Sequence, residues 1–572
     1  MRPKAIVRAL APEEWALLAW IVALHGYVAS ASVYTLLTWF HIDDAFYYFT
    51  VARNIVLGRG VTFDGLGPTN GFHPLWMALL VLVYALLGRG GDLIGPLRGI
   101  VVLTGVVHGL TGVVLYRAGR RVFHRLVAWG LAVAWVFAPG VVRAYAAGSI
   151  ESTLNALTLA GVWLASLRLL EAPERRRAWL VWGGSLAAAL LARLDNIFVV
   201  GLTVAAMLLR QRAVWWPWLR EPRRRARALL AWLAAWAGPP LALVGGYLLW
   251  SWAYVGGIVP VSGQVKAWWG TFGQGTPYGH PKADPWPMLV LKANLDPRAG
   301  KPWSLFLTPA WDLYQRAAGA DLGLPAMQSW REGLPVAAAG LVVAGLLALT
   351  RRAWWPVFRR AWLGPWLLGG IVHASYYPIA RHMAVRHWYW VGQRLLSYIL
   401  LAVVAQAVLE AWQARRGPLR LAPRVTAGLL AGMLLLAAGR LTYTMTRTYR
   451  HDRAGTHMYL DYARWVEAHT EPGARIGATG AGSLGYFVRG RTIVNLDGLI
   501  SNYAYLEAMK RGRRVAYLRA AGLDYVLIGK ALYDRPPYQD LTPYLEEVAR
   551  YFNADEQWGI VLRRFQPPPT PR

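Results

Sequence analysis

Long apolar stretches recur along most of this chain, and they restrict its fold more strongly than any other feature. The first covers residues 13–38 and the last residues 424–442. Each is long enough, or nearly long enough, to cross a hydrocarbon core of ~30 Å as a helix. Since 56% of the 572 residues are hydrophobic, we predict a polytopic α-helical membrane protein. The first stretch is too long, and starts too late, for a cleaved signal peptide, so we interpret it as a retained span.

Short basic clusters separate the apolar stretches, although the formal net charge of the whole chain is +31. The clusters are Arg2–Arg8, Arg117–Arg125, Arg175–Arg177, Arg210–Arg227, Arg351–Arg360 and Arg415–Arg424. Arginine in short loops between spans is typical of the cytoplasmic side. The basic residues form no separate soluble domain, so we expect no nucleic-acid partner.

Placing every basic cluster in the cytoplasm predicts about eleven transmembrane helices, with the N-terminus inside and the C-terminus outside. The expected spans are 13–38, 96–116, 127–146, 152–171, 178–191, 197–209, 228–252, 333–350, 362–380, 389–412 and 424–442. The alternation holds only if residues 75–87 do not fully cross, so we expect an interfacial or re-entrant helix there. The spans on either side of residues 192–196 are short, which predicts that this connection is recessed below the outer surface.

The domain organisation follows from the same pattern. Residues 1–441 are expected to form the membrane domain, with external loops at 40–95 and 254–332. Residues 442–565 are expected to form a small extracytoplasmic α/β domain, and the proline-rich tail 566–572 is expected to be disordered. Within the α/β domain, a helical pattern at 458–469 precedes three short strand patterns, at 475–478, 492–496 and 525–528.

The first external loop holds the densest group of polar residues, and it begins with Asp43 and Asp44. A helix is expected from Asp43 to about Gly58, with Phe46, Phe49, Ala52 and Val56 on one face. One interpretation is structural, because an Asp before a helix is an ordinary N-cap and a second Asp suits the helix dipole. The other is catalytic, with one carboxylate acting as general base beside Tyr47 and His73.

Four more polar segments are expected on the same side of the membrane, and three of them also have a structural interpretation. Glu151 begins a helix and could serve only the helix dipole, Arg193 and Asp195 could pair with each other, and Lys266 could extend to the interface rather than bind an anion. Arg381 and Arg386 break the positive-inside pattern, so they need another reason, such as binding a phosphate group.

Carboxylates and cations therefore gather on one face of the membrane. This fits a reaction in which a base removes a proton from a hydroxyl acceptor and cations stabilise a departing lipid phosphate. The chain has no cysteine, which excludes thiolate metal sites and cysteine nucleophiles, and it has no nucleotide-binding fingerprint.

Several motifs resemble the membrane glycosyltransferases of the GT-C fold over roughly residues 1–400. They are Asp43-Asp44, Ala52-Arg53-Asn54, Gly58-Arg59-Gly60, Pro74-Leu75-Trp76, Gly148 to Glu151, Leu191 to Asp195, and Ser262-Gly263 to Lys266. The motifs around Glu151 and Arg193 are similar to those of arabinofuranosyltransferase-like and mannosyltransferase-like bacterial members. Gly485-Tyr486-Phe487 and Asn495 to Gly498 resemble a C-terminal domain of bacterial relatives, with no known chemistry.

The resemblance implies transfer of a sugar from a polyprenyl-phosphate donor at the outer face of a bacterial cytoplasmic membrane, by an inverting substitution. It implies Asp43 as the base, with Asp44 as the alternative. The acceptor is a glycan, a lipid or a protein, and no metal or other cofactor is expected. An oligosaccharyltransferase-like enzyme with a diphosphate donor and a divalent metal, a lipid-linked glycan transporter or flippase, and an inactive binding homologue remain alternatives.

Overall fold

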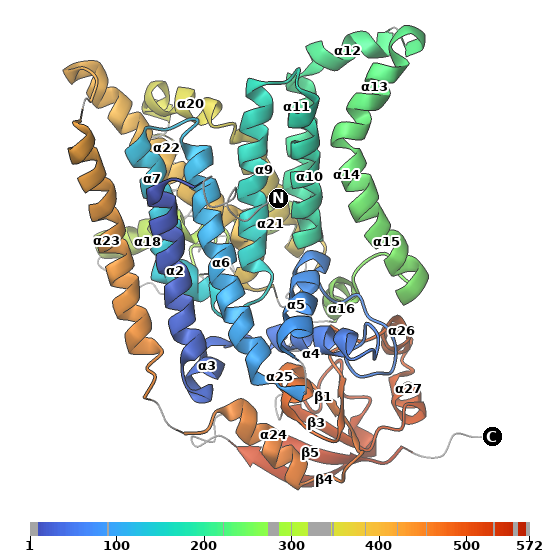
Figure 1. Cartoon of the computed structure of the whole chain (residues 1–572). Coiled ribbons are helices and arrows are strands. Elements are labelled where there is room, and N and C mark those ends of the chain that lie inside the picture. Colours follow the sequence, from blue (N-terminus) through green and yellow to red (C-terminus); the bar gives the residue numbers. More distant parts are fainter. Residues whose placement is uncertain are drawn as a thin grey trace.

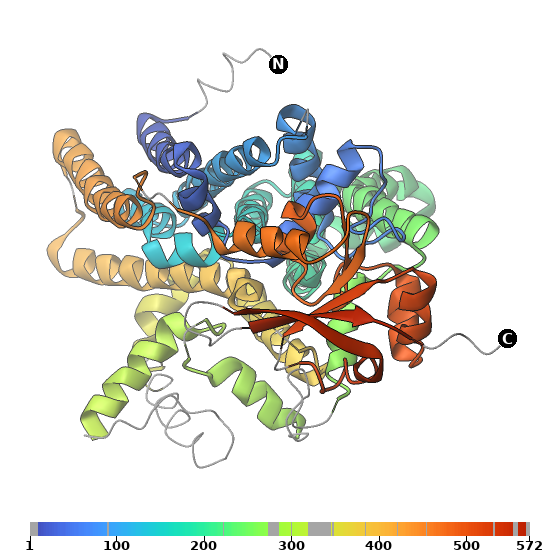
Figure 2. The ribbon, with the colours of Figure 1, turned by 90° about the horizontal axis from the view of Figure 1, so that it is seen from below.

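A bundle of long helices with a mixed β-sheet across one end makes up the computed structural model of the chain (Figure 1). The structure describes residues 10–567 except 89–90, 221, 273–284, 299, 319–344, 346–347, 384, 420, 453–454, 530–531 and 553–558. Seen from the sheet end, the strands lie across the middle of the bundle (Figure 2).

The bundle consists mainly of helices that run between the sheet end and the opposite end. They are α2 (Pro12–Ser30), α6 (Ile94–Gly119), α7 (Arg125–Phe137), α9 (Ser152–Glu171), α10 (Arg176–Ala192), α11 (Ile197–Arg210), α21 (Gly364–Ile379), α22 (Val391–Arg416) and α23 (Pro423–Thr448). A bent run of consecutive segments, α13 (Pro222–Trp236), α14 (Gly238–Pro240) and α15 (Gly246–Trp250), takes a similar course. The basic helices α12 (Arg212–Arg220) and α20 (Arg351–Arg360) lie at the end opposite the sheet (Figure 1).

Four helical segments of the described chain are long and apolar enough to cross a membrane: 94–119, 152–171, 387–416 and 423–448. Three further pairs qualify jointly, although each pair bends by more than 40°. By length and composition, the described chain therefore has four to seven candidate spans, fewer than the predicted eleven. Most of the predicted span 333–350 lies outside the described residues.

The first predicted span shows why the count differs. The helix expected over 13–38 breaks in two, because the Ser32 hydroxyl accepts a hydrogen bond from the backbone N–H of Thr35 and starts α3 (Val33–Trp39). The helix α10 has 17 residues and α21 has 16, so both fall short of a full span.

The loop that follows α3 contributes α4 (Asp44–Val56) and α5 (Pro74–Leu87) near the junction of the bundle and the sheet. The helix α4 was expected to bury one face, but Phe46, Tyr47, Tyr48, Phe49 and Val51 are all buried. Its outward face is buried because the sheet domain covers it (Figure 1). The helix α5 has 14 residues and lies in the lower half of the bundle, and α6 begins at the sheet end. The stretch between α2 and α6 therefore starts and ends at the same end of the bundle.

Other short helices lie near the site or beside the bundle. They are α16 (Val261–Trp269), α17 (Trp286–Leu295) and α18 (Ser304–Ala318), with three π-helical turns at Val142–Ala146, Leu241–Gly245 and Ser251–Val255.

The C-terminal part folds around a five-stranded sheet in the order β2-β1-β3-β5-β4. Its elements are α24 (Met458–Ala468), β1 (Arg475–Ala478), α25 (Gly482–Phe487), β2 (Thr492–Asn495), α26 (Tyr503–Lys510), α27 (Arg514–Ala520), β3 (Tyr525–Gly529), β4 (Leu545–Phe552) and β5 (Gly559–Phe565). The three parallel strands and α24 confirm the strand and helix predictions to within a residue. The antiparallel strands β4 and β5 were not predicted. Residues 568–572 of the predicted disordered tail lie outside the described residues.

The sheet domain is held against the region of α4 by close backbone approaches. The N-terminus of α25 lies directly against Asp43, so a Cβ atom on Gly482 would lie 2.2 Å from the Asp43 carbonyl oxygen. Similarly, a Cβ atom on Gly71 would lie 2.2 Å from the carbonyl oxygen of Leu499. Glycine at both positions therefore permits the contact between the two parts of the chain.

A Gly482→Ala substitution should loosen the sheet domain from the bundle. The added methyl group meets a backbone atom, which cannot move aside as a side-chain end can, and overpacking of this kind costs about 1–3 kcal/mol. We expect a lower thermal midpoint and faster proteolysis of residues after about 450 in the purified protein. Gly529→Ala is the control, because its nearest neighbour is 3.9 Å away. Equal midpoints for the two variants would contradict the prediction.

Candidate functional site

The two adjacent aspartates have different surroundings. The Asp43 carboxylate accepts hydrogen bonds from the backbone N–H groups of Gly482 (2.9 Å) and Ser483 (2.8 Å). It thus caps α25 of the sheet domain, and it makes no side-chain cap on its own helix α4. Asp44 lines a cavity, and the described structure records no hydrogen bond to its carboxylate.

The cavity beside Asp44 has a volume of about 70 Å³ and lies where the bundle meets the sheet domain. Six residues that the sequence singles out line it: Asp44, Tyr47, His73, Glu151, Arg193 and Lys266. Its wall also includes Tyr48, Tyr389 and Leu499, and Leu499 comes from the sheet domain. The predicted convergence of separate polar segments is therefore present in the structure for these six residues.

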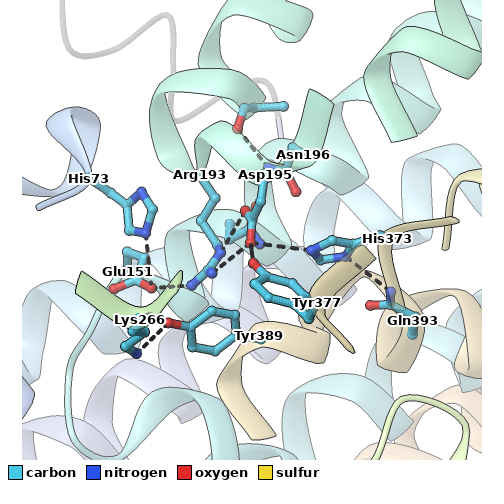
Figure 3. Close-up of polar contacts among 12 residues, drawn as sticks. His73, Glu151, Arg193, Asp195, Asn196, Lys266, His373, Tyr377, Tyr389 and Gln393 are labelled. Atoms are coloured by element: carbon cyan, nitrogen blue, oxygen red, sulfur yellow. Dashed lines mark hydrogen bonds and ion pairs between the residues drawn. The ribbon is translucent and has the colours of Figure 1, made fainter. Parts of the chain in front are cut away.

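Arg193 is the centre of a buried charge network (Figure 3). Its guanidinium binds both oxygens of Asp195, at 3.0 and 2.8 Å, and also pairs with Glu151. Arg193 and Asp195 do pair with each other, as one interpretation predicted, but they pair within a larger network. Arg193 is 3% exposed, and two carboxylates share its single positive charge, so we infer that it orients the network rather than binding a free anion.

Glu151 joins this network to α4 and to the loop before α5. The Tyr48 hydroxyl donates to Glu151 Oε2 at 3.0 Å, and His73 Nε2 lies 3.7 Å from Glu151 Oε1. The side chain of Glu151 makes no cap on α9. Its contacts are therefore tertiary, and the interpretation as a helix-dipole partner alone does not describe them.

Sequence reasoning missed the partners of Asp195 on α21. His373 Nε2 lies 3.2 Å from Asp195 Oδ2, the Tyr377 hydroxyl donates to the same oxygen, and the side chains of His373 and Gln393 hydrogen-bond at 3.1 Å (Figure 3). Ionisable and amide side chains within apolar stretches are a signal for such a site. His373 and Gln393 lie in predicted spans, so this signal was present in the sequence.

Lys266 faces the cavity. It is 8% exposed, and its Nζ donates to the Tyr389 hydroxyl at 2.6 Å. It does not extend to the outer surface, which was the alternative interpretation. Because the structure records no carboxylate partner for Lys266 among the described residues, its charge is available to an anion in the cavity.

The two arginines before α22 have separate positions. Arg381 is exposed, has a left-handed φ of 54°, and lines neither this cavity nor the larger one described below. Its neighbour His382 lines the larger cavity instead. Arg386 is exposed, but its charge acts on Asp44. Neither arginine lines either cavity, but Arg386 is close enough to Asp44 to lower its pKa. Phosphate binding by these two residues stays a prediction.

The pKa of the Asp44 carboxyl reflects these neighbours. Burial raises the pKa of Asp44, and the nearby Glu151 carboxylate raises it further. The Lys266 ammonium and the Arg386 guanidinium act in the opposite direction. Burial also raises the pKa of Asp43, to about 6, although the two amides of α25 favour its ionised form.

The sheet domain contributes a polar contact that the sequence did not predict. Asp497, 5% exposed, accepts hydrogen bonds from the Gly480 N–H at 2.7 Å and the Tyr538 hydroxyl at 2.6 Å. The Tyr47 hydroxyl lies 3.5 Å from Asp497 and accepts a hydrogen bond from Asn495 at 3.1 Å. The carboxyl ends of β1 and β2 therefore hold the ring of Tyr47 at the wall of the cavity.

A second, larger cavity of about 450 Å³ adjoins the first. The two share His73, Arg193, Ser262, Lys266 and Tyr389. Much of the wall of the larger cavity is apolar or aromatic, with Ile197, Phe198, Val259, Pro260 and Tyr376 among its residues. Ile197 is 51% exposed and Val259 is 55% exposed, so this wall continues into an apolar outer surface.

Within the part of the chain that the structure describes, no group of three or more His, Asp or Glu side chains is arranged to hold a metal ion. The expectation that the protein uses no metal stays a prediction.

Comparisons with known proteins match the two parts of the chain differently. A family described as a domain of unknown function (DUF8728) matches residues 447–566, which include the whole sheet. No curated protein sequence matches the chain.

Three solved structures are similar to most of the chain. ArnT from Cupriavidus metallidurans in the apo state is 14% identical, with a TM-score of 0.48, over 91% of this chain and 93% of that one. The oligosaccharyltransferase of Archaeoglobus fulgidus is 14% identical, with a TM-score of 0.42, over 96% and 74%. The arabinofuranosyltransferase AftD from Mycobacteria is 14% identical, with a TM-score of 0.38, over 98% of this chain and 40% of that one. Over most of its length the chain is similar in structure to GT-C glycosyltransferases, at low sequence identity.

Proposed function

We propose that this chain is an inverting glycosyltransferase that moves a sugar from a polyprenyl-phosphate donor to a hydroxyl acceptor, with Asp44 as the general base. The observation that carries the proposal is the position of Asp44. It lines a small cavity together with Lys266, and that cavity adjoins a larger, mostly apolar one. A base, a cation and an apolar wall are what a lipid-phosphate sugar requires of its site.

The roles of the residues follow from their contacts. The donor lipid lies along the larger cavity, so that its phosphate reaches Lys266 and its sugar enters the smaller cavity. Asp44 removes the proton of the acceptor hydroxyl as the acceptor oxygen attacks the anomeric carbon. The bond from that carbon to the phosphate oxygen breaks, and the phosphate leaves with the electron pair. Lys266 and Arg386 stabilise the charge that develops on it.

Asp43 and Arg193 have supporting roles in this proposal. Asp43 is occupied by two amides of α25 and fixes the sheet domain above the site. Arg193 holds Glu151 and Asp195 in place. The sequence resemblance favoured Asp43 as the base, whereas these hydrogen bonds favour Asp44.

We also propose that the sheet end of the bundle faces the outside of a bacterial cytoplasmic membrane. The basic helices α12 and α20 lie at the opposite end (Figure 1), which the positive-inside rule places in the cytoplasm. The N-terminus is then cytoplasmic, the site is extracytoplasmic, and the acceptor is a glycan, lipid or protein on that side.

The proposal is tested by sugar transfer from radiolabelled polyprenyl-phosphate sugars to a panel of hydroxyl acceptors, as a function of pH. The acid limb of kcat/KM reports the ionisation of the free base. The ordinary pKa of an aspartate is ~4. Because burial raises the pKa of Asp44, we expect the midpoint of the acid limb to lie at a higher pH than this. Activity should fall as the pH decreases through the raised pKa, since only the ionised carboxylate accepts the proton.

Lys266→Gln removes a cation that lowers the pKa of Asp44, so the acid limb should move to higher pH as the rate decreases. Lys301→Gln is the matched control, because the Lys301 ammonium pairs with Asp296 at 3.3 Å and lines neither cavity. If Lys266→Gln lowered the rate but left the acid limb of the pH profile unchanged, the electrostatic effect of Lys266 on the pKa of Asp44 would be contradicted. Absence of transfer from every donor tested would contradict the proposed function.

A further inference from the structure

A separate cavity of about 540 Å³ lies farther along α4, between the loop that follows this helix and the connection from α25 to β2. Four arginines line it, Arg53 and Arg59 from the bundle side and Arg489 and Arg491 from the sheet domain. Among the described residues, Asp64 is the one acidic residue in its wall. The cavity therefore has an excess of positive charge, and it shares no lining residue with the site at Asp44.

Two of the arginines are fixed by neutral partners. Arg53 donates to the carbonyl oxygens of Tyr486 (2.9 Å) and Gly485 (3.2 Å), and Arg491 donates to the carbonyl oxygen of Glu467 (2.7 Å). These contacts orient the guanidinium groups and leave their charge uncompensated. Among the described residues, none of the four arginines forms an ion pair with a carboxylate.

Two polar atoms near the wall of the cavity are buried without a hydrogen-bond partner in the described structure. They are Arg53 Nε and Thr50 Oγ1, and both residues line the cavity. Thr50 is 2% exposed, so its hydroxyl has little access to bulk water. These two atoms lie behind the cavity surface, so the charge of the arginines, and not these atoms, favours an anion in the cavity.

The arginines of the cavity also affect one another. Burial lowers the pKa of Arg53, and the neighbouring Arg59 guanidinium lowers it further because the two positive charges repel each other. An anion between them would turn this repulsion into attraction. Phosphate suits the arrangement because arginine binds its oxygens in a planar, bidentate geometry.

The rim of the cavity is apolar on the side of α4 and α5. Leu57 and Leu93 line the cavity, and Leu57 is 48% exposed. The Tyr84 hydroxyl of α5 donates to the hydroxyl of Tyr486, a lining residue, at 2.9 Å. A phosphate group attached to an apolar chain would match both surfaces.

We propose that this cavity is a second, non-catalytic binding site for a phosphate group, carried by a lipid headgroup or free in solution. Because the bundle supplies Arg53 and Arg59 and the sheet domain supplies Arg489 and Arg491, a bound phosphate would cross-link the two. Binding should then raise the thermal midpoint of the full chain.

The test measures binding of dioctanoyl phosphatidic acid and of inorganic phosphate to the purified full-length protein, by calorimetry and by thermal shift. Arg59→Gln combined with Arg489→Gln removes the two exposed arginines, for which the described structure records no side-chain hydrogen bond, so the fold should persist. We expect Kd to rise at least about tenfold, as loss of charge-assisted hydrogen bonds predicts. The matched control is Arg511→Gln combined with Arg513→Gln, which removes the same charge from the sheet domain outside the cavity.

Asp64→Asn provides a test with the opposite sign. It removes the only acid among the described residues of the cavity wall, so affinity for both probes should increase, a result that misfolding cannot produce. If the Arg59→Gln, Arg489→Gln double substitution weakens the binding of one probe or of both, the result supports the site. The probe whose binding is weakened identifies the source of the phosphate. Unchanged Kd values for both probes would overturn the proposal. These measurements report binding alone, so their failure leaves the proposed sugar transfer untouched.

Discussion

Replacing Asp44 with asparagine is expected to slow sugar transfer by about 10²- to 10⁴-fold, the usual contribution of a general base. The amide has the shape of the carboxylate but cannot take up the acceptor proton. The described structure records no hydrogen bond to the Asp44 side chain, so the substitution should leave folding and insertion intact. Transfer from a radiolabelled polyprenyl-phosphate sugar at saturating donor measures the effect.

Asp43→Asn is the matched comparison, because it makes the same chemical change one residue earlier. Asparagine keeps one oxygen to accept from the N–H groups of Gly482 and Ser483 but loses the charge and the second oxygen. We therefore expect a lower thermal midpoint with most of the transfer rate retained. The reverse order, with Asp43→Asn inactive and Asp44→Asn active, would assign the base to Asp43.

Replacing Arg193 with methionine is expected to destabilise the protein by about 3–5 kcal/mol, the usual cost of removing one partner from a buried ion pair. Its guanidinium is 3% exposed and compensates both Glu151 and Asp195. Without it, two carboxylates remain buried near each other with no cation between them. The thermal midpoint of the detergent-solubilised protein, followed by tryptophan fluorescence, measures this effect.

Arg193→Lys separates charge from geometry. Lysine restores the positive charge but cannot bind both oxygens of Asp195 in the bidentate manner of a guanidinium, so we expect an intermediate loss. Arg360→Gln, which breaks the exposed pair with Glu410, should change the midpoint little. If Arg193→Met and Arg360→Gln had equal effects, the network around Arg193 would not be a stabilising centre.

Much of the fold could be predicted because its signals are local. The three parallel strands of the sheet domain coincide with short buried patterns, and the long helices coincide with apolar stretches. The break at residues 31–32 was missed because one serine cap ended an otherwise continuous apolar stretch. The strands β4 and β5 were missed as well. The strand β4 is exposed and charged over much of its length, so it lacks a buried alternating pattern.

The residue types at the expected ends of the helices were enough to predict that several polar segments lie on one side of the membrane. Asp44, His73, Glu151, Arg193 and Lys266 meet around one cavity. The sequence could not include Asn495 and Asp497 in this group. Their approach to Tyr47 depends on how the sheet domain docks onto α4, and local patterns carry no information about that docking.

The sequence by itself determined that the chain is a membrane protein, that it carries an α/β sheet domain, and that polar residues gather at one end of its helices. Only the tertiary structure decided how the two aspartates differ. The amides that occupy Asp43 belong to residues 439 and 440 positions further along the chain, whereas Asp44 faces the cavity. A local pattern can place Asp43 at the N-cap and Asp44 in the first turn, but it cannot show that a distant helix N-terminus hydrogen-bonds to Asp43 and not to Asp44.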